Sequence, residues 1–87
     1  MTFKTYELTE EQMNAAKELV EGNKRAVGNF TCEEVDEDMV LVWIDYSEDD
    51  EYSKFLIDAL DNGATIYTLY DNLGGMSQPL GEFVVFD

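Results

Sequence analysis

The residues with the clearest chemical potential are carboxylates, ten of which fall within residues 33–51, EEVDEDMVLVWIDYSEDDE. They form two blocks on either side of an apolar run, residues 39–44, and the stretch contains no Lys or Arg. Dense negative charge attracts basic surfaces, so the stretch points to the binding of a positively charged site on another macromolecule. The ten residues are Glu33, Glu34, Asp36, Glu37, Asp38, Asp45, Glu48, Asp49, Asp50 and Glu51.

Negative charge is concentrated in one part of the chain. The net charge is −15, from 20 acidic and 5 basic residues. Residues 1–28 carry four basic against five acidic residues, whereas in residues 29–87 Lys54 alone stands against fifteen acidic residues. Such self-repulsion destabilises a compact domain, so a function is expected to favour its retention.

Most catalytic chemistry is excluded by what the sequence lacks. There is no histidine and one cysteine, which removes His-assisted nucleophiles, His general bases and zinc clusters. Gly74–Gly75 does not form a phosphate-binding motif. Asp45, between Ile44 and Tyr46, is the only candidate for a desolvated acid–base carboxylate, and we expect it to be solvated at a strand end. The sequence therefore predicts no enzyme and no cofactor.

The carboxylates also do not follow a specific metal-binding pattern. When Gly63 is aligned with the glycine of a calcium-binding EF-hand loop, Leu60 and Leu69 fall where side-chain oxygens are needed. The acidic blocks are expected to bind divalent ions only loosely, and no metal site is predicted.

The sequence also bears on the compartment. A single cysteine, Cys32, forms no intramolecular disulfide and suits a reducing cytoplasm. The first residues lack the apolar segment of a signal peptide, and no apolar run approaches the ~18 residues of a membrane span. Because anionic lipids and bare nucleic acid repel an acidic protein, we expect a cytoplasmic protein without direct membrane or nucleic-acid binding.

The chain, at 87 residues and 45% hydrophobic, is predicted to form one domain, residues 1–87. Residues 2–8 are expected to be a strand. Residues 10–21 carry clear helix signals: Thr9 and Gln12 match a capping box, and Leu8 and Met13 match a hydrophobic staple. Gly22 is expected to end this helix in a left-handed conformation. Lys24 and Arg25 follow, where the helix dipole favours cations.

The apolar run is predicted to be a strand. Residues 29–35 and 39–46 are interpreted as a hairpin across residues 36–38, and two-sided apolarity makes 39–46 a central strand. Ser47 is expected to cap a second helix that ends at Asn62–Gly63. Strands 64–70 and 81–87 are expected to pair antiparallel across a turn or loop at 71–80.

This order, β-α-β-β-α-β-β, predicts an α+β domain with an antiparallel or mixed sheet and two helices on one face. A ferredoxin-like arrangement would fit the order.

The charge and size suggest an acidic inhibitor that mimics DNA and occupies the nucleic-acid-binding site of a target, such as a phage-encoded anti-CRISPR or anti-restriction protein in a bacterial host. Trp43, Tyr46 and Tyr52 lie nearest the acidic blocks and are the proposed apolar anchors. Burial in the core is the alternative for Trp43.

Two other functions fit the same composition. One is an immunity protein that neutralises a basic nuclease toxin, and the other is a non-inhibitory regulatory or structural domain that is acidic for solubility. A monomer is preferred, because equal charges oppose self-association. A homodimer is the alternative if a second apolar sheet face is left uncovered, formed by Leu41, Trp43, Val84 and Phe86.

Overall fold

A computed structural model describes residues 1–22 and 26–87. Lys24 and Arg25, expected at the end of the first helix, lie outside the described residues. The elements, in chain order, are β1 (Thr2–Thr5), α1 (Glu10–Glu21), β2 (Phe30–Glu34), α2 (Glu37–Tyr46), α3 (Asp50–Asp61), β3 (Thr65–Asp71), the 3-10 helix η1 (Leu73–Gly75) and β4 (Gln78–Phe86).

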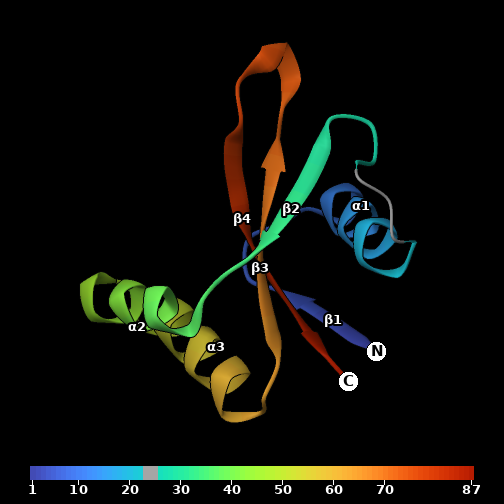
Figure 1. Ribbon diagram of the computed structural model, residues 1–87. Helices are drawn as coiled ribbons and strands as arrows, with labels where there is room; N and C mark the ends of the chain where they lie inside the picture. The colour runs from blue at the N-terminus through green and yellow to red at the C-terminus, as the bar shows by residue number, and fades with distance from the viewer. Residues whose placement is uncertain (23–25) are drawn as a thin grey trace.

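The four strands form one antiparallel sheet with the order β1-β4-β3-β2. The hairpin of β3 and β4 forms its centre, and the pairing of Thr2 with Phe86 brings the two ends of the chain together (Figure 1). The α+β class and the antiparallel sheet are confirmed. The ferredoxin-like arrangement is not found. A split βαβ unit joins two parallel strands with one antiparallel strand between them, whereas both β4 and β3 lie between β1 and β2, which run in opposite directions.

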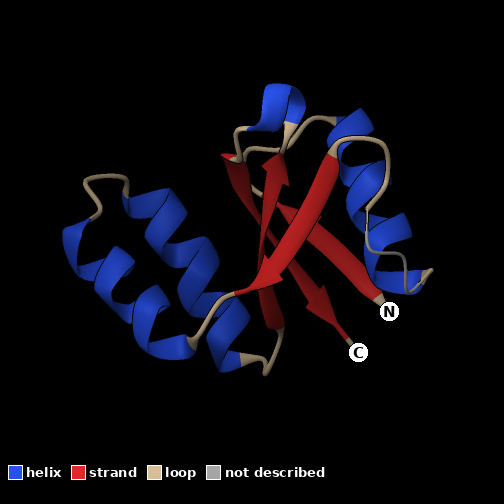
Figure 2. Ribbon diagram, turned by 45° about the horizontal axis from the view of Figure 1, so that its top comes forward, coloured by secondary structure: helices blue, strands red, loops and turns tan. Residues whose placement is uncertain are grey.

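Helices cover both faces of this sheet (Figure 2). On one face, Ala16 and Leu19 of α1 pack with Leu69 and Phe83. On the other face, α2 and α3 pack together over Ile66 and Val84. Two helices do share one face, as expected, but a third helix covers the opposite face.

The start of α1 follows its sequence signals closely. The Gln12 amide donates to the Thr9 hydroxyl (3.2 Å), and the Thr9 amide donates to the Gln12 side chain (3.0 Å), which confirms the capping box. Leu8 and Met13 belong to one apolar cluster. The left-handed ending is wrong: Gly22 has a φ of −88°, and its amide donates to the Glu18 carbonyl.

The strand predicted for residues 39–46 is wrong, because these residues form α2. Asp36 caps the helix by accepting a bond from the Asp38 amide (3.2 Å), and Glu37 and Asp38 lie in the first turn. Carboxylates there complement the helix dipole, a compensation that a hairpin turn would not give them. An apolar run without clear polar positions is compatible with both the helical period and the strand period. Packing of Val40 in the core favours the helix.

The next helix starts two residues later than Ser47 would place it. Asp49 caps α3 by accepting bonds from the amides of Glu51 (3.0 Å) and Tyr52 (3.1 Å). The Ser47 hydroxyl instead accepts a bond from the Asp49 amide (3.1 Å). The predicted end is confirmed: α3 stops at Asp61, and Gly63 follows with a φ of +69°.

The C-terminal hairpin agrees with the predicted strands at 64–70 and 81–87, and their antiparallel pairing is confirmed. β4 begins earlier than expected, at Gln78, so the connection at 71–80 is shorter and contains η1.

The helical assignment of α2 can be tested with two valines. In a strand Val40 and Val42 would share a face, whereas in α2 Val40 is 0% and Val42 45% exposed. Val40→Ala is expected to lower the free energy of unfolding by about 2 kcal/mol through lost burial and a cavity. Val42→Ala should change it by less than about 0.5 kcal/mol. Urea unfolding measures both, and equal losses would contradict the helix.

Candidate functional site: an acidic surface around helix α2

The ten carboxylates of residues 33–51 are all exposed, and α2 separates them into two clusters. Ten residues of helix place the two ends of α2 about 15 Å apart. The first acidic cluster surrounds the start of α2 and consists of Glu33, Glu34, Asp36, Glu37 and Asp38. The second acidic cluster surrounds its end and the start of α3 and consists of Asp45, Glu48, Asp49, Asp50 and Glu51.

Apolar side chains are exposed between the two clusters. Met39, Leu41, Val42 and Tyr46 all lie on α2, and Tyr46 is 85% exposed. Met39, Val42 and Tyr46 share one side of the helix at spacings of three and four residues, and we call these three residues the α2 strip; Leu41 is exposed on another side. Helical spacing explains this exposure: Val40, Trp43 and Ile44 face the core, so the remaining apolar residues of the helix face outward. An exposed apolar strip between charged clusters is typical of an interaction surface.

The three predicted aromatic anchors occupy different environments. Tyr46 is free of the core, whereas Trp43 is half-buried and packs against the cluster under α2 and α3. Tyr52 is also half-buried, and its ring lies 5.4 Å from that of Tyr6. The structure thus presents Tyr46 outward, gives Trp43 a partly exposed position and uses Tyr52 to pack α3 near the end of β1.

Two members of the acidic clusters also hold the structure together. Asp36 and Asp49 are the caps of α2 and α3. Asp49 also accepts a hydrogen bond from the Tyr6 hydroxyl (3.0 Å), and this bond is the main reason that the pKa of Tyr6 is raised. Capping therefore explains Asp36 and Asp49, and the first turns of α2 and α3 hold four more carboxylates that complement the helix dipoles. Neither role applies to the remaining four, which are Glu33, Glu34, Asp45 and Glu48.

A groove lies between α2 and the sheet, next to the first acidic cluster. It has a volume of about 350 Å³. Met39 and Trp43 form its helical wall, and Thr68 and Tyr70 of β3 form its sheet wall. The end of β2 and the α2 cap complete it through Glu33, Glu34, Val35 and Asp36. We call it the β2–α2 groove.

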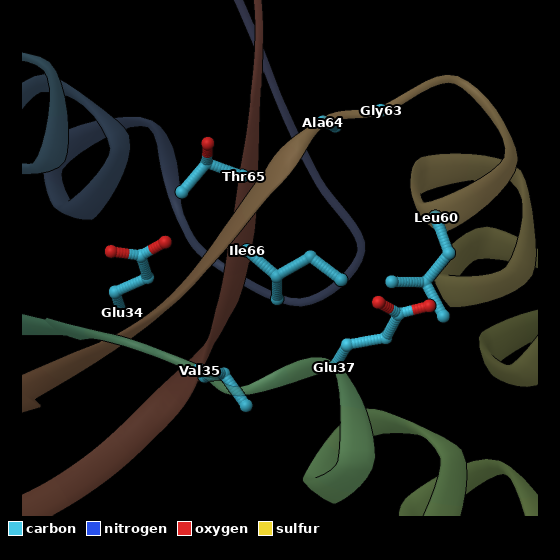
Figure 3. Close-up of a pocket in the computed structure, with 8 residues that line it drawn as sticks. All are labelled: Glu34, Val35, Glu37, Leu60, Gly63, Ala64, Thr65 and Ile66. Atoms are coloured by element: carbon cyan, nitrogen blue, oxygen red, sulfur yellow. The ribbon is translucent and has the colours of Figure 1, made fainter.

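A second hollow of about 220 Å³ lies where the β2–α2 and α3–β3 connections approach each other (Figure 3). Its two carboxylates do not converge. Figure 3 shows Glu34 on one side near Thr65 and Glu37 on the other side near Leu60, with Ile66 between them. This arrangement offers no paired carboxylates for acid–base chemistry or for chelation.

Glu82 is the carboxyl with the most unusual environment. The register places Glu33, Thr68 and Glu82 side by side across β2, β3 and β4. Glu82 is half-buried, and this burial, together with the negative charge of Glu7, raises its pKa from 4.5 to about 7. The sheet therefore holds a carboxyl group that titrates near neutral pH.

Sequence reasoning identifies the acidic residues and Tyr46, but it misses the exposed apolar residues Met39 and Val42 of α2. The predicted central strand would bury Met39 and Val42, whereas Leu41 is expected on a second sheet face that could be left uncovered. In the structure all three are exposed on α2. Helical spacing of Val40, Trp43 and Ile44 was the signal that could have separated them. Tyr70 gave no local signal, because only the folded sheet places it beside α2.

Other features of the described residues add no further site. No group of three or more His, Cys, Asp or Glu side chains in residues 1–22 and 26–87 is arranged to hold a metal ion. In the same part of the chain, no helix is both long and apolar enough to cross a membrane. Comparisons with protein-family models, curated proteins and solved structures give no match to this chain.

The raised pKa of Glu82 predicts a pH-dependent stability. The folded state holds a proton on Glu82 that the unfolded state releases, so this group lowers the free energy of unfolding as pH rises from about 4.5 to about 7. Glu82→Gln should remove this loss. The variant is expected to have a higher Tm than the wild type at pH 8, with the advantage fading at pH 4.5.

Thermal denaturation at several pH values measures the effect. Glu33→Gln is the matched control, because it removes the same charge from the exposed neighbour in the same row of the sheet. If both variants change Tm equally at every pH, the burial of Glu82 is not the cause.

Proposed function

We propose that this protein is an acidic inhibitor that mimics DNA and occupies the nucleic-acid-binding site of another protein. The observation that carries the proposal is the surface of α2, where two clusters of exposed carboxylates flank an exposed apolar strip. Carboxylates steer the protein to a basic site, and the apolar strip supplies contact area once it arrives. The role is one of binding rather than catalysis.

The charge density of the molecule supports this proposal. The longest dimension is 32 Å, and duplex DNA of that length carries about 19 phosphate charges. The protein carries a net charge of −15. A basic groove built for a short duplex would therefore meet a body of similar length and similar charge.

The spacing of the two clusters adds a geometric argument. They lie at the ends of a helix about 15 Å long, and the major groove that separates the phosphate strands of DNA is about 12 Å wide. Basic residues placed to contact both strands can thus reach both clusters. The α2 strip then takes the position of the DNA major groove between the two phosphate strands.

The biological setting that fits is antagonism of a host defence enzyme. We propose an anti-CRISPR or anti-restriction role in the cytoplasm of a bacterial host, with a monomer as the active form because two copies repel each other. An immunity protein that blocks a basic nuclease toxin uses the same physical mechanism. The identity of the captured partner separates the two roles.

Charge neutralisation around α2 should weaken binding more than the same change on α1. The test variant replaces two carboxylates from each cluster and keeps both helix caps: Glu33→Gln, Glu34→Gln, Asp45→Asn and Glu48→Gln. The control variant makes the same change in charge on α1: Glu10→Gln, Glu11→Gln, Glu18→Gln and Glu21→Gln. At about 0.2–1 kcal/mol for each exposed charge pair, the test variant should bind its partner at least about fourfold more weakly.

The measurement is capture from bacterial lysate with each tagged variant, followed by elution with duplex DNA and mass spectrometry. The wild type and the control should retain a nucleic-acid enzyme that duplex DNA displaces, whereas the test variant should retain less of it. If all three retain the same salt-labile mixture of basic proteins, the charge serves solubility and the proposal fails.

Tyr46 provides a test of the apolar contact. Because it is 85% exposed, Tyr46→Ala should change the free energy of unfolding by less than about 0.5 kcal/mol. A buried interface tyrosine contributes more than about 1 kcal/mol, so the affinity for the isolated partner should fall about fivefold or more. Leu73→Ala, at a site on the β3–β4 connection that is 69% exposed, is the control and should leave affinity unchanged. Equal affinities by calorimetry for both variants would exclude Tyr46 as an anchor.

A further inference from the structure

The β2–α2 groove combines two features that suit one kind of side chain. Its walls are apolar and aromatic, formed by Met39 and Trp43 on one side and Tyr70 on the other. Carboxylates of β2 and of the α2 cap, Glu33 and Asp36, lie along its margin. All its lining residues belong to the described part of the chain, and none is basic.

The sheet explains why the carboxylate and the tyrosine share the groove. Phe30 and Cys32 of β2 pack on the α1 side, so the alternation of a strand turns Glu33 to the α2 side. Glu33 pairs with Thr68, which is 5% exposed and belongs to the sheet wall of the groove, and Tyr70 lies two residues further on the same face of β3. The strand register and alternation thus form the groove, on the part of this sheet face that α2 and α3 leave uncovered.

We propose that the β2–α2 groove receives an arginine side chain of the partner. Its aliphatic part would lie along Met39, and its guanidinium group would face the aromatic rings and the carboxylate of Glu33. This inference rests on the proposed function, because it names what the partner brings to the same surface. Charge complementarity selects the occupant: an acidic margin around an apolar groove attracts a cation that also has apolar surface.

Arginine fits this groove better than lysine. A guanidinium group is planar, stacks on aromatic faces and binds a carboxylate through two parallel hydrogen bonds. It is also less strongly hydrated than an ammonium group, so partial burial between Trp43 and Tyr70 costs less. Arginine is moreover the residue that DNA-binding proteins use most often for base contacts. A partner that binds DNA would therefore present arginine where the mimic presents this groove.

Trp43 is the only tryptophan of the chain, so its fluorescence reports directly on the groove. The probes are two capped peptides of equal charge, hexa-arginine and hexa-lysine, titrated at the same ionic strength. We expect hexa-arginine to change the Trp43 emission saturably and to bind about two- to fivefold more tightly than hexa-lysine, the ratio expected for one exposed cation–π contact.

Three variants localise the effect. Tyr70→Leu removes the aromatic ring, and Glu33→Gln removes the carboxylate charge at the margin of the groove. Each should weaken hexa-arginine binding about two- to fivefold. Tyr70→Phe keeps the ring and should bind like the wild type, which separates the loss of the ring from a folding defect. Glu18→Gln on α1 removes one charge away from the groove and sets the effect of net charge alone.

The inference is overturned if both peptides bind with equal affinity, or if Glu33→Gln behaves like Glu18→Gln. Because the titration uses no target protein, its failure is distinct from failure of the proposed function. If the two peptides bind equally and duplex DNA still displaces a captured partner, the arginine contact is excluded and the DNA-mimic function is retained. If hexa-arginine binds selectively but no partner displaced by DNA is captured, the groove binds basic peptides and the DNA-mimic function is excluded.

Discussion

Three consecutive residues of β4, Phe83, Val84 and Val85, are buried, and this constraint determines the architecture. Neighbouring residues of a strand point to opposite faces, so the sheet must be covered on both sides. α1 covers Phe83 and Val85, and the pair of α2 and α3 covers Val84. The three helices are thus divided between the two faces of the sheet. As a result, one side of α2 is packed and the other side is in solvent.

The exposed side of α2 is therefore a consequence of the fold that the sequence has kept apolar and surrounded with carboxylates. Repulsion among these charges lowers stability, and the helix caps Asp36 and Asp49 recover only part of that cost through the helix dipoles. A surface built for solubility alone would need neither Tyr46 nor Val42 in solvent. The combination of strong charge with exposed apolar area favours a partner whose site is basic at its rims and apolar at its centre.

The fold was predictable from sequence wherever local signals agreed with tertiary packing. Thr9 and Gln12 specify the start of α1, and the β-branched and aromatic residues of β3 specify a strand. The strand expected for residues 39–46 is wrong because their apolar run is compatible with the period of a helix and with that of a strand. Only the packing of Val40 in the core decides between the two. The candidate site was predictable in its charges but not in its shape. Trp43 and Tyr70 lie 27 positions apart in the chain, and only the packing of α2 against the sheet brings them to one groove.

The most direct test of the central claim is amide hydrogen exchange of this protein, alone and bound to the partner that duplex DNA displaces. The account predicts slower exchange within residues 33–51, at α2 and the two acidic clusters, with α1 unchanged. Protection on α1 or on the β3–β4 connection, with α2 still exchanging as in the free protein, would contradict it.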